Sequence, residues 1–324
     1  MKKVMTVLTC ALMLNNYAAE VDQFTKRNDP LNDSSMILNQ KANEYVQIAL
    51  SKLNKSKINC QSLDEEKNLY SELRKYFANH TKGELTIYAL KSDDVQKRKL
   101  KIQDSIFQHW TIWDGFLLGR SSANDSDLAL GPLIKMDNVV IGTDKLEHLF
   151  GRGFAYFNNY YLKGKSLEKT IDSGVFGEKT LYGGNKLATG VFSYADLSAN
   201  FNGMRFWNHM LQKRADVMGD NFGPYIVCNQ DNQWEQVKNI DFTHYFDESN
   251  DEAINCSKFP TEKTAKKYAQ VVKSLAVSGE HFTGSAGCPI DPQALDAMKK
   301  KYGQFSKYIL NLSVDRDVSY FNEF

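Results

Sequence analysis

Two pairs of polar residues at helical spacing could form a reactive site. Asp144 and His148 are four residues apart, and so are Asp196 and Asn200. On a helix this spacing places both side chains on one face, with about 5–6 Å between their Cβ atoms. A carboxylate beside an imidazole can orient the ring and raise its basicity, and a second carboxylate nearby could be a general base or a metal ligand. Glu178, between the two pairs in the sequence, is a candidate third acid.

Small residues surround both pairs. Gly151 and Gly153 follow the first pair, and Gly203 comes seven residues after Asp196, which places it two turns along the same face. They would let two helices approach closely, so we expect the pairs to line one polar pocket. The simpler interpretation is that each pair is an ordinary surface pair, and that Asp196 only caps or begins its helix.

The order of these residues resembles a known family pattern. The chain reads Asp144-Lys145-x-x-His148, then Glu178, then Asp196-Leu-x-Ala-Asn200-x-x-Gly203. This is similar to the D-K-x-x-H, later Glu and D-x-x-A-N-x-x-G of VanZ-like envelope proteins, over about 60 residues. VanZ-like segments are membrane helices, whereas polar and charged residues interrupt the corresponding run here between positions 158 and 165. The resemblance therefore implies a soluble, secreted version of that helical core, and a site rather than a reaction.

The N-terminus has the features of a signal peptide. Lys2 and Lys3 precede an 11-residue apolar run from Val4 to Leu14, and Ala18 and Ala19 supply small residues for cleavage before residue 20. The run is too short to span a bilayer, and no later run reaches the length of about 18 apolar residues that a membrane helix needs. We expect residues 1–19 to be removed, a secreted or periplasmic mature chain, and no membrane span in it.

The cysteines are consistent with that compartment. Cys10 lies in the signal peptide, and a lipoprotein signal centred on it fits less well because Thr9 precedes it. The other four form an even set in an oxidising environment, which predicts two disulfides with three possible pairings. A lone reactive thiol is a minor alternative, and no two of the four have the close spacing of a zinc site. These four cysteines are Cys60, Cys228, Cys256 and Cys288.

Composition excludes several classes of protein. The 324 residues include 40 Lys and Arg against 39 Asp and Glu, and 42% of them are hydrophobic. Removing the signal peptide takes away two lysines, so the mature chain is almost neutral. A polybasic nucleic-acid binder, a disordered chain and a disulfide-dense miniprotein are excluded. We expect a cell-envelope component as the partner, and no nucleic acid.

Hydrophobic periodicity predicts a mainly α fold with few short strands and a loop-rich, disulfide-bonded C-terminal third. We expect a flexible arm over 20–34 and one large helical domain over 35–324, whose most patterned part is 139–210. A single strand is expected over 85–90, and the acidic stretch 247–252 is expected to be a solvated loop rather than a calcium site. The expected helices cover 35–53, 62–82, 102–118, 144–161, 196–210, 261–277 and 292–312.

Two functions fit these features. The first is a hydrolase acting on an envelope polymer or lipid, with Glu178 as the acid, Asp196 as the base or ligand, and His148 as a proton carrier oriented by Asp144. The second is a non-catalytic structural or binding protein whose polar network locks the packing of its helices. An open cleft over Asp196 and Glu178 would favour the enzyme, and a closed network would favour the structural role. The sequence leaves the substrate, any cofactor and any metal open.

Overall fold

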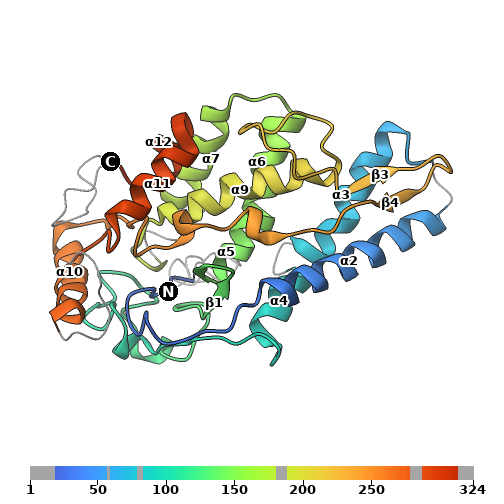
Figure 1. Ribbon diagram of the computed structural model, residues 1–324. Helices are drawn as coiled ribbons and strands as arrows, with labels where there is room; N and C mark the ends of the chain where they lie inside the picture. The colour runs from blue at the N-terminus through green and yellow to red at the C-terminus, as the bar shows by residue number, and fades with distance from the viewer. Residues whose placement is uncertain (1–18, 57–58, 79–82, 180–187, 278–286, 313–324) are drawn as a thin grey trace, which may run out of the picture.

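The computed structural model describes residues 19–56, 59–78, 83–179, 188–277 and 287–312, and Figure 1 shows their arrangement. Apart from Ala19, the predicted signal peptide lies outside these residues. The prediction of a mainly helical fold is confirmed, since the described strands form only two small antiparallel sheets. In the part of the chain that is described, no helix is long and apolar enough to cross a membrane.

Three helices form the N-terminal part. They are α2 (Ser35–Lys55), α3 (Leu63–Phe77) and α4 (Glu84–Lys91). The predicted apolar stripe of α2 is buried, and α3 begins directly after Ser62 as expected, although the Ser62 side chain makes no capping hydrogen bond. The prediction of a strand over 85–90 is wrong, because α4 occupies this segment and packs against α2 and α3. Packing of the buried face of α4 outweighs the preference of Thr86 and Ile87 for β-strands.

The predicted aromatic helix over 102–118 is also wrong. Only Ile102–Asp104 forms a short 3₁₀ turn, and further turns follow. Carboxylates take hydrogen bonds from backbone N–H groups here: Asp22 accepts from Ile106 at 2.9 Å and Asp114 accepts from Thr111 at 2.8 Å. Such side-chain bonds compete with the helical ladder, so the segment folds as turns.

The predicted patterned core forms the centre of the molecule. A hairpin of β1 (Leu133–Met136) and β2 (Val139–Gly142) leads into a continuous helical run. The run contains α5 (Asp144–Glu147), a π-helical turn His148–Arg152, α6 (Gly153–Phe157) and a second π-helical turn Asn158–Leu162. After α7 (Leu167–Lys179), helix α9 (Tyr194–Leu211) passes through the middle of the fold (Figure 1).

Two glycines set the distance between this run and α9. A Cβ placed on Gly203 would lie 2.0 Å from the backbone oxygen of Leu149, and one on Gly153 would lie 2.5 Å from the Cα of Gly203. Nothing larger than glycine fits without moving backbone. The close approach predicted from the small residues is therefore present, and it brings α9 against the helix that carries His148.

The C-terminal third is rich in loops. It contains β3 (Ile226–Cys228) paired with β4 (Trp234–Gln236), and helices α10 (Glu262–Val277), α11 (Pro292–Tyr302) and α12 (Ser306–Ile309). The predicted helix over 292–312 is thus divided, because Gly303 has φ +50° and ends α11. Two disulfides, Cys60–Cys228 and Cys256–Cys288, confirm the predicted pairing of all four cysteines.

The predicted flexible arm is packed over its first residues. Glu20 through Phe24 are buried, and Glu20 pairs with the backbone near Leu130. Two hydrophobic clusters lie inside the molecule, one around α2, α3 and α9 and the other around residues 100–130 and α10. Polar groups next to residues of both clusters form the site described below.

Candidate functional site

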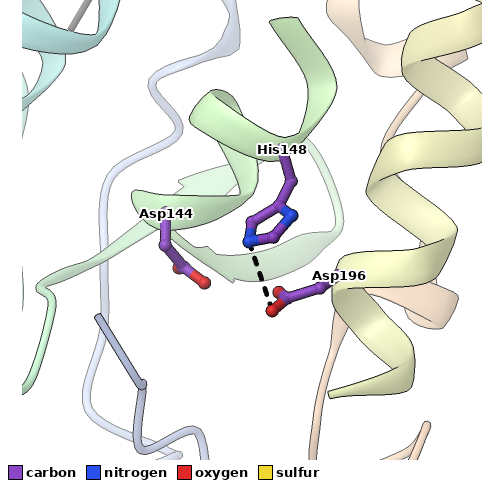
Figure 2. A group of neighbouring side chains, drawn as sticks. All are labelled: Asp144, His148 and Asp196. Atoms are coloured by element: carbon purple, nitrogen blue, oxygen red, sulfur yellow. Dashed lines mark ion pairs between the residues drawn. The ribbon is translucent and has the colours of Figure 1, made fainter. Parts of the chain in front are cut away.

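The site forms where β2 turns into α5 and faces the start of α9. Asp144 is the first residue of α5, and His148 follows one turn later on the same helical run. Asp196 lies in the first turn of α9, where the side chain of the N-cap residue Ser193 accepts a hydrogen bond from the Asp196 backbone N–H. Figure 2 shows the three functional side chains directed toward one another from these two helices. The predicted convergence of the two pairs is therefore present in the structure.

The imidazole of His148 is fixed at both nitrogens by α9. Its Nε2 lies 3.2 Å from Oδ2 of Asp196, and its Nδ1 lies 3.1 Å from Oδ1 of Asn200. These two α9 residues, rather than Asp144, are at hydrogen-bond distance from the ring. His148 also retains 13% side-chain exposure, whereas the Asp196 side chain retains 4%. The ring is therefore the part of the site nearest to solvent.

Lys145 is the central cation of the site. Its side chain is fully buried, and its Nζ lies 2.6 Å from Oδ2 of Asp144, 2.7 Å from Oδ1 of Asp196 and 2.9 Å from Oε1 of Glu252. A buried ammonium needs such partners, because desolvating an unpaired charge is very costly. Lys145 belongs to the D-K-x-x-H pattern, but no role was predicted for it, although its position between two candidate site residues was a usable signal.

Glu252 joins the site from the segment predicted to be a solvated acidic loop. That prediction is wrong, since Asp251 and Glu252 are 1% and 4% exposed. Glu252 Oε1 accepts a hydrogen bond from the Ser193 hydroxyl at 2.7 Å, and the Glu252 backbone N–H donates to the side chain of Gln23 at 2.7 Å. The short segment is buried because its carboxylates find partners on other parts of the chain.

Glu20 is a fourth buried carboxylate close to the site. Its Oε1 accepts a hydrogen bond from the Thr189 hydroxyl at 2.6 Å. Burial raises the pKa of Glu20 well above its ordinary value, and the negative charges of Glu252 and Asp196 raise it further. This residue falls in the segment predicted to be a flexible arm, and no sequence pattern links it to the site.

The pKa values of the other three carboxyl groups shift in different directions. Burial raises the pKa of Asp144 and of Glu252, and Lys145 opposes this only in part. Burial also acts to raise the pKa of Asp196, but His148 and Lys145 outweigh it and hold that pKa below its ordinary value. Asp196 is thus the carboxylate of the site that most strongly keeps its negative charge. Such divided environments are frequent at acid–base and metal sites.

Three buried polar atoms of the site have no hydrogen-bond partner among the described residues: Oδ1 of Asp144, Oδ1 of Asp196 and Nδ2 of Asn200. Of these, Oδ1 of Asp196 forms an ion pair with Nζ of Lys145 at 2.7 Å. The Asp144 carboxylate can take this position only because residue 142 is glycine, since a Cβ there would lie 2.0 Å from Oδ1. Buried polar atoms are normally paired, so an unpaired carboxylate oxygen indicates room for a donor or a cation.

Glu178, the predicted acid, lies in α7, but its side chain lies outside the described residues. A catalytic triad of Ser193, His148 and Asp196 is not supported by geometry, because the Ser193 hydroxyl is already engaged with Glu252 and with the backbone of α9.

Comparisons with protein-family models, with curated proteins and with solved structures find no match to this chain. The resemblance to VanZ-like proteins therefore stays a prediction from the residue pattern.

Proposed function

We propose that this chain is a secreted or periplasmic cell-envelope protein that hydrolyses an envelope polymer or lipid at the site formed by Asp144, His148 and Asp196. One observation carries the proposal: a partly exposed imidazole is held between Asp196 and Asn200, in front of a fully buried set of charges. Orienting an imidazole with a carboxylate is how proteins prepare it to exchange protons with a substrate or with water.

The location is proposed from two features. The two disulfides support an oxidising compartment, because such bonds persist in secreted and periplasmic proteins and are rare in the cytosol. The sequence features of the first 19 residues support export. The resemblance to VanZ-like envelope proteins is the reason for choosing an envelope polymer or lipid as the substrate class.

The roles that we propose for these residues differ from those expected from the sequence. Asp196 Oδ2 and His148 Nε2 face one another, so a water molecule at this contact would be polarised by both groups. Asp144 contacts Lys145 rather than the ring, and acts by holding that lysine and by adding negative charge. In the proposed reaction Asp196 and His148 act together as the base, and Lys145 keeps Asp196 ionised.

Burial favours a second candidate function. Lys145 is completely enclosed, and Glu20, Asp196 and Glu252 are each less than 5% exposed. A closed network of this kind could serve only to lock α5, α9 and the segment around Glu252 together, as in the non-catalytic alternative. The two functions differ in what happens when His148 is removed, since its side chain is the most exposed of the site, at 13%.

The deciding experiment incubates the purified mature protein with separate envelope fractions and measures released products by mass spectrometry. Suitable fractions are peptidoglycan sacculi and phospholipid or glycolipid vesicles. We expect release from one fraction, and a loss of about 100-fold or more in His148→Ala. His109→Ala is the matched control, because His109 is an exposed histidine outside the site. Absence of release from every fraction would leave the structural role as the better account.

A further inference from the structure

We infer that Asp144, His148 and Asp196 form a binding site for one divalent transition-metal ion, with Zn²⁺ as the ion that suits the ligand set. One ligand atom from each of these residues lies within 4.8 Å of the other two. Figure 2 shows the two carboxylates on either side of the Nε2 edge of the ring. Imidazole nitrogen together with carboxylate oxygen is a common ligand combination for Zn²⁺. The inference rests on the proposed function for its chemical purpose, but it is tested separately.

The contacts of the His148 ring match those of a metal-binding histidine. Its Nδ1 lies 3.1 Å from Oδ1 of Asn200, so this nitrogen has the outer polar partner that metal-binding histidines usually have. Its Nε2 lies 3.2 Å from Oδ2 of Asp196, so one ion could contact both atoms. His148 and Asp196 would then bind the same ion from facing helices.

The distances between the ligand atoms suit a bound Zn²⁺ ion. Ligand atoms about 2.0–2.2 Å from a tetrahedral Zn²⁺ lie about 3.5 Å from one another. The separation of 3.2 Å between His148 Nε2 and Asp196 Oδ2 is close to that value. A side-chain movement of about 1 Å would bring the third ligand atom, from Asp144, into range. The 13% exposure of the His148 side chain leaves an edge of the site near solvent.

The contacts of Lys145 leave one oxygen of each aspartate available for the ion. Its Nζ contacts Oδ2 of Asp144 and Oδ1 of Asp196, so one oxygen of each carboxylate remains. The remaining oxygen of Asp144 is a buried atom without a hydrogen-bond partner, which is an observation independent of the clustering.

When bound, Zn²⁺ would lower the pKa of a coordinated water toward neutrality, and this would replace the base action of His148 and Asp196 in activating the water. The residues of this chain have distinct tasks around it. Asp144, His148 and Asp196 bind, Asn200 orients the ring through Nδ1, and Lys145 holds the two aspartates through one oxygen of each. Asn200 is therefore a positioning residue, not a ligand.

The test uses the mature protein, stripped with a chelator and titrated with Zn²⁺ by isothermal calorimetry. We expect one ion per chain, binding weakened about 100-fold or more in His148→Ala and in Asp144→Asn, and weakened about 10–100-fold in Asn200→Ala. His109→Ala should bind as the wild type does. Thermal melts check folding: Zn²⁺ at about 100 times its dissociation constant should raise the wild-type melting temperature by about 5 °C and leave His148→Ala unchanged.

The outcomes separate the two proposals. Stoichiometric binding that both ligand variants lose supports the metal site, even if no envelope fraction is hydrolysed. Wild-type binding no tighter than that of His148→Ala overturns it, as does binding that survives in both ligand variants. In those cases hydrolysis of an envelope fraction would still support the proposed function.

Discussion

The close contact between α9 and the helix that carries His148 can be tested by adding one methyl group. In Gly203→Ala the new Cβ would lie 2.0 Å from the backbone oxygen of Leu149 and 2.9 Å from the Cα of Gly153, whereas ordinary contacts begin at 3.4 Å. The obstructing atoms belong to the backbone, so no side chain can rotate away. The two helices must separate by about 1 Å or more.

The expected magnitude follows from two opposed effects. Replacing glycine by alanine in a helix gains up to about 1 kcal/mol through backbone propensity. Overpacking costs about 1–3 kcal/mol, and a clash with backbone belongs near the upper end. We expect Gly203→Ala to lower the free energy of unfolding by about 2 kcal/mol, which for a chain of about 300 residues corresponds to a fall of about 3 °C in the melting temperature.

Gly151→Ala is the matched control, because it changes a glycine in the same helical run where a Cβ would meet only Oε2 of Glu147, at 3.8 Å. Its stability should be unchanged or raised by up to about 1 kcal/mol. Both variants are measured by thermal and urea denaturation, followed by the Zn²⁺ titration. Separation of the helices should move Asp196 away from His148 and weaken binding in Gly203→Ala alone. Equal melting temperatures for the two variants would refute the packing argument.

Three further predictions concern the buried charges and the disulfides. Lys145→Met leaves three buried carboxylates without their cation, so urea denaturation should show a decrease of about 3–5 kcal/mol in the free energy of unfolding. A decrease below about 1 kcal/mol would count against the network. Burial raises the pKa of Glu252 above its ordinary 4.5, so above pH 4.5 the folded state keeps a proton that the unfolded chain has released. The free energy of unfolding therefore falls by up to about 1.4 kcal/mol per pH unit as the pH rises above 4.5. Glu252→Gln should flatten this fall, and identical pH profiles of the unfolding free energy would contradict the assignment. Thiol titration of the denatured, unreduced protein should find almost no free thiol, and replacing Cys60 and Cys228 by serine should destabilise by about 5 kcal/mol, because the bridge joins residues 168 apart.

Periodicity in the sequence predicted most of the long helices. The apolar stripe of α2 and the spacing of Asp196 and Asn200 on α9 are local patterns, and a helix follows from local patterns when one face can be buried. The segments 85–90 and 102–118 were predicted wrongly for the converse reason. Their backbone is decided by tertiary contacts, which are the packing of α4 and the hydrogen bonds that backbone N–H groups donate to carboxylates such as Asp22.

The sequence alone was enough to bring Asp144, His148, Asp196 and Asn200 together as a hypothesis, because spacing of four residues and neighbouring glycines are visible in one dimension. Only the tertiary structure decided which groups neutralise them. Lys145 meets Glu252 across 107 residues of sequence, and Glu20 meets Thr189 across 169. Burial of a charge is stable only where partners arrive from other segments, and that arrangement depends on the packing of the whole chain.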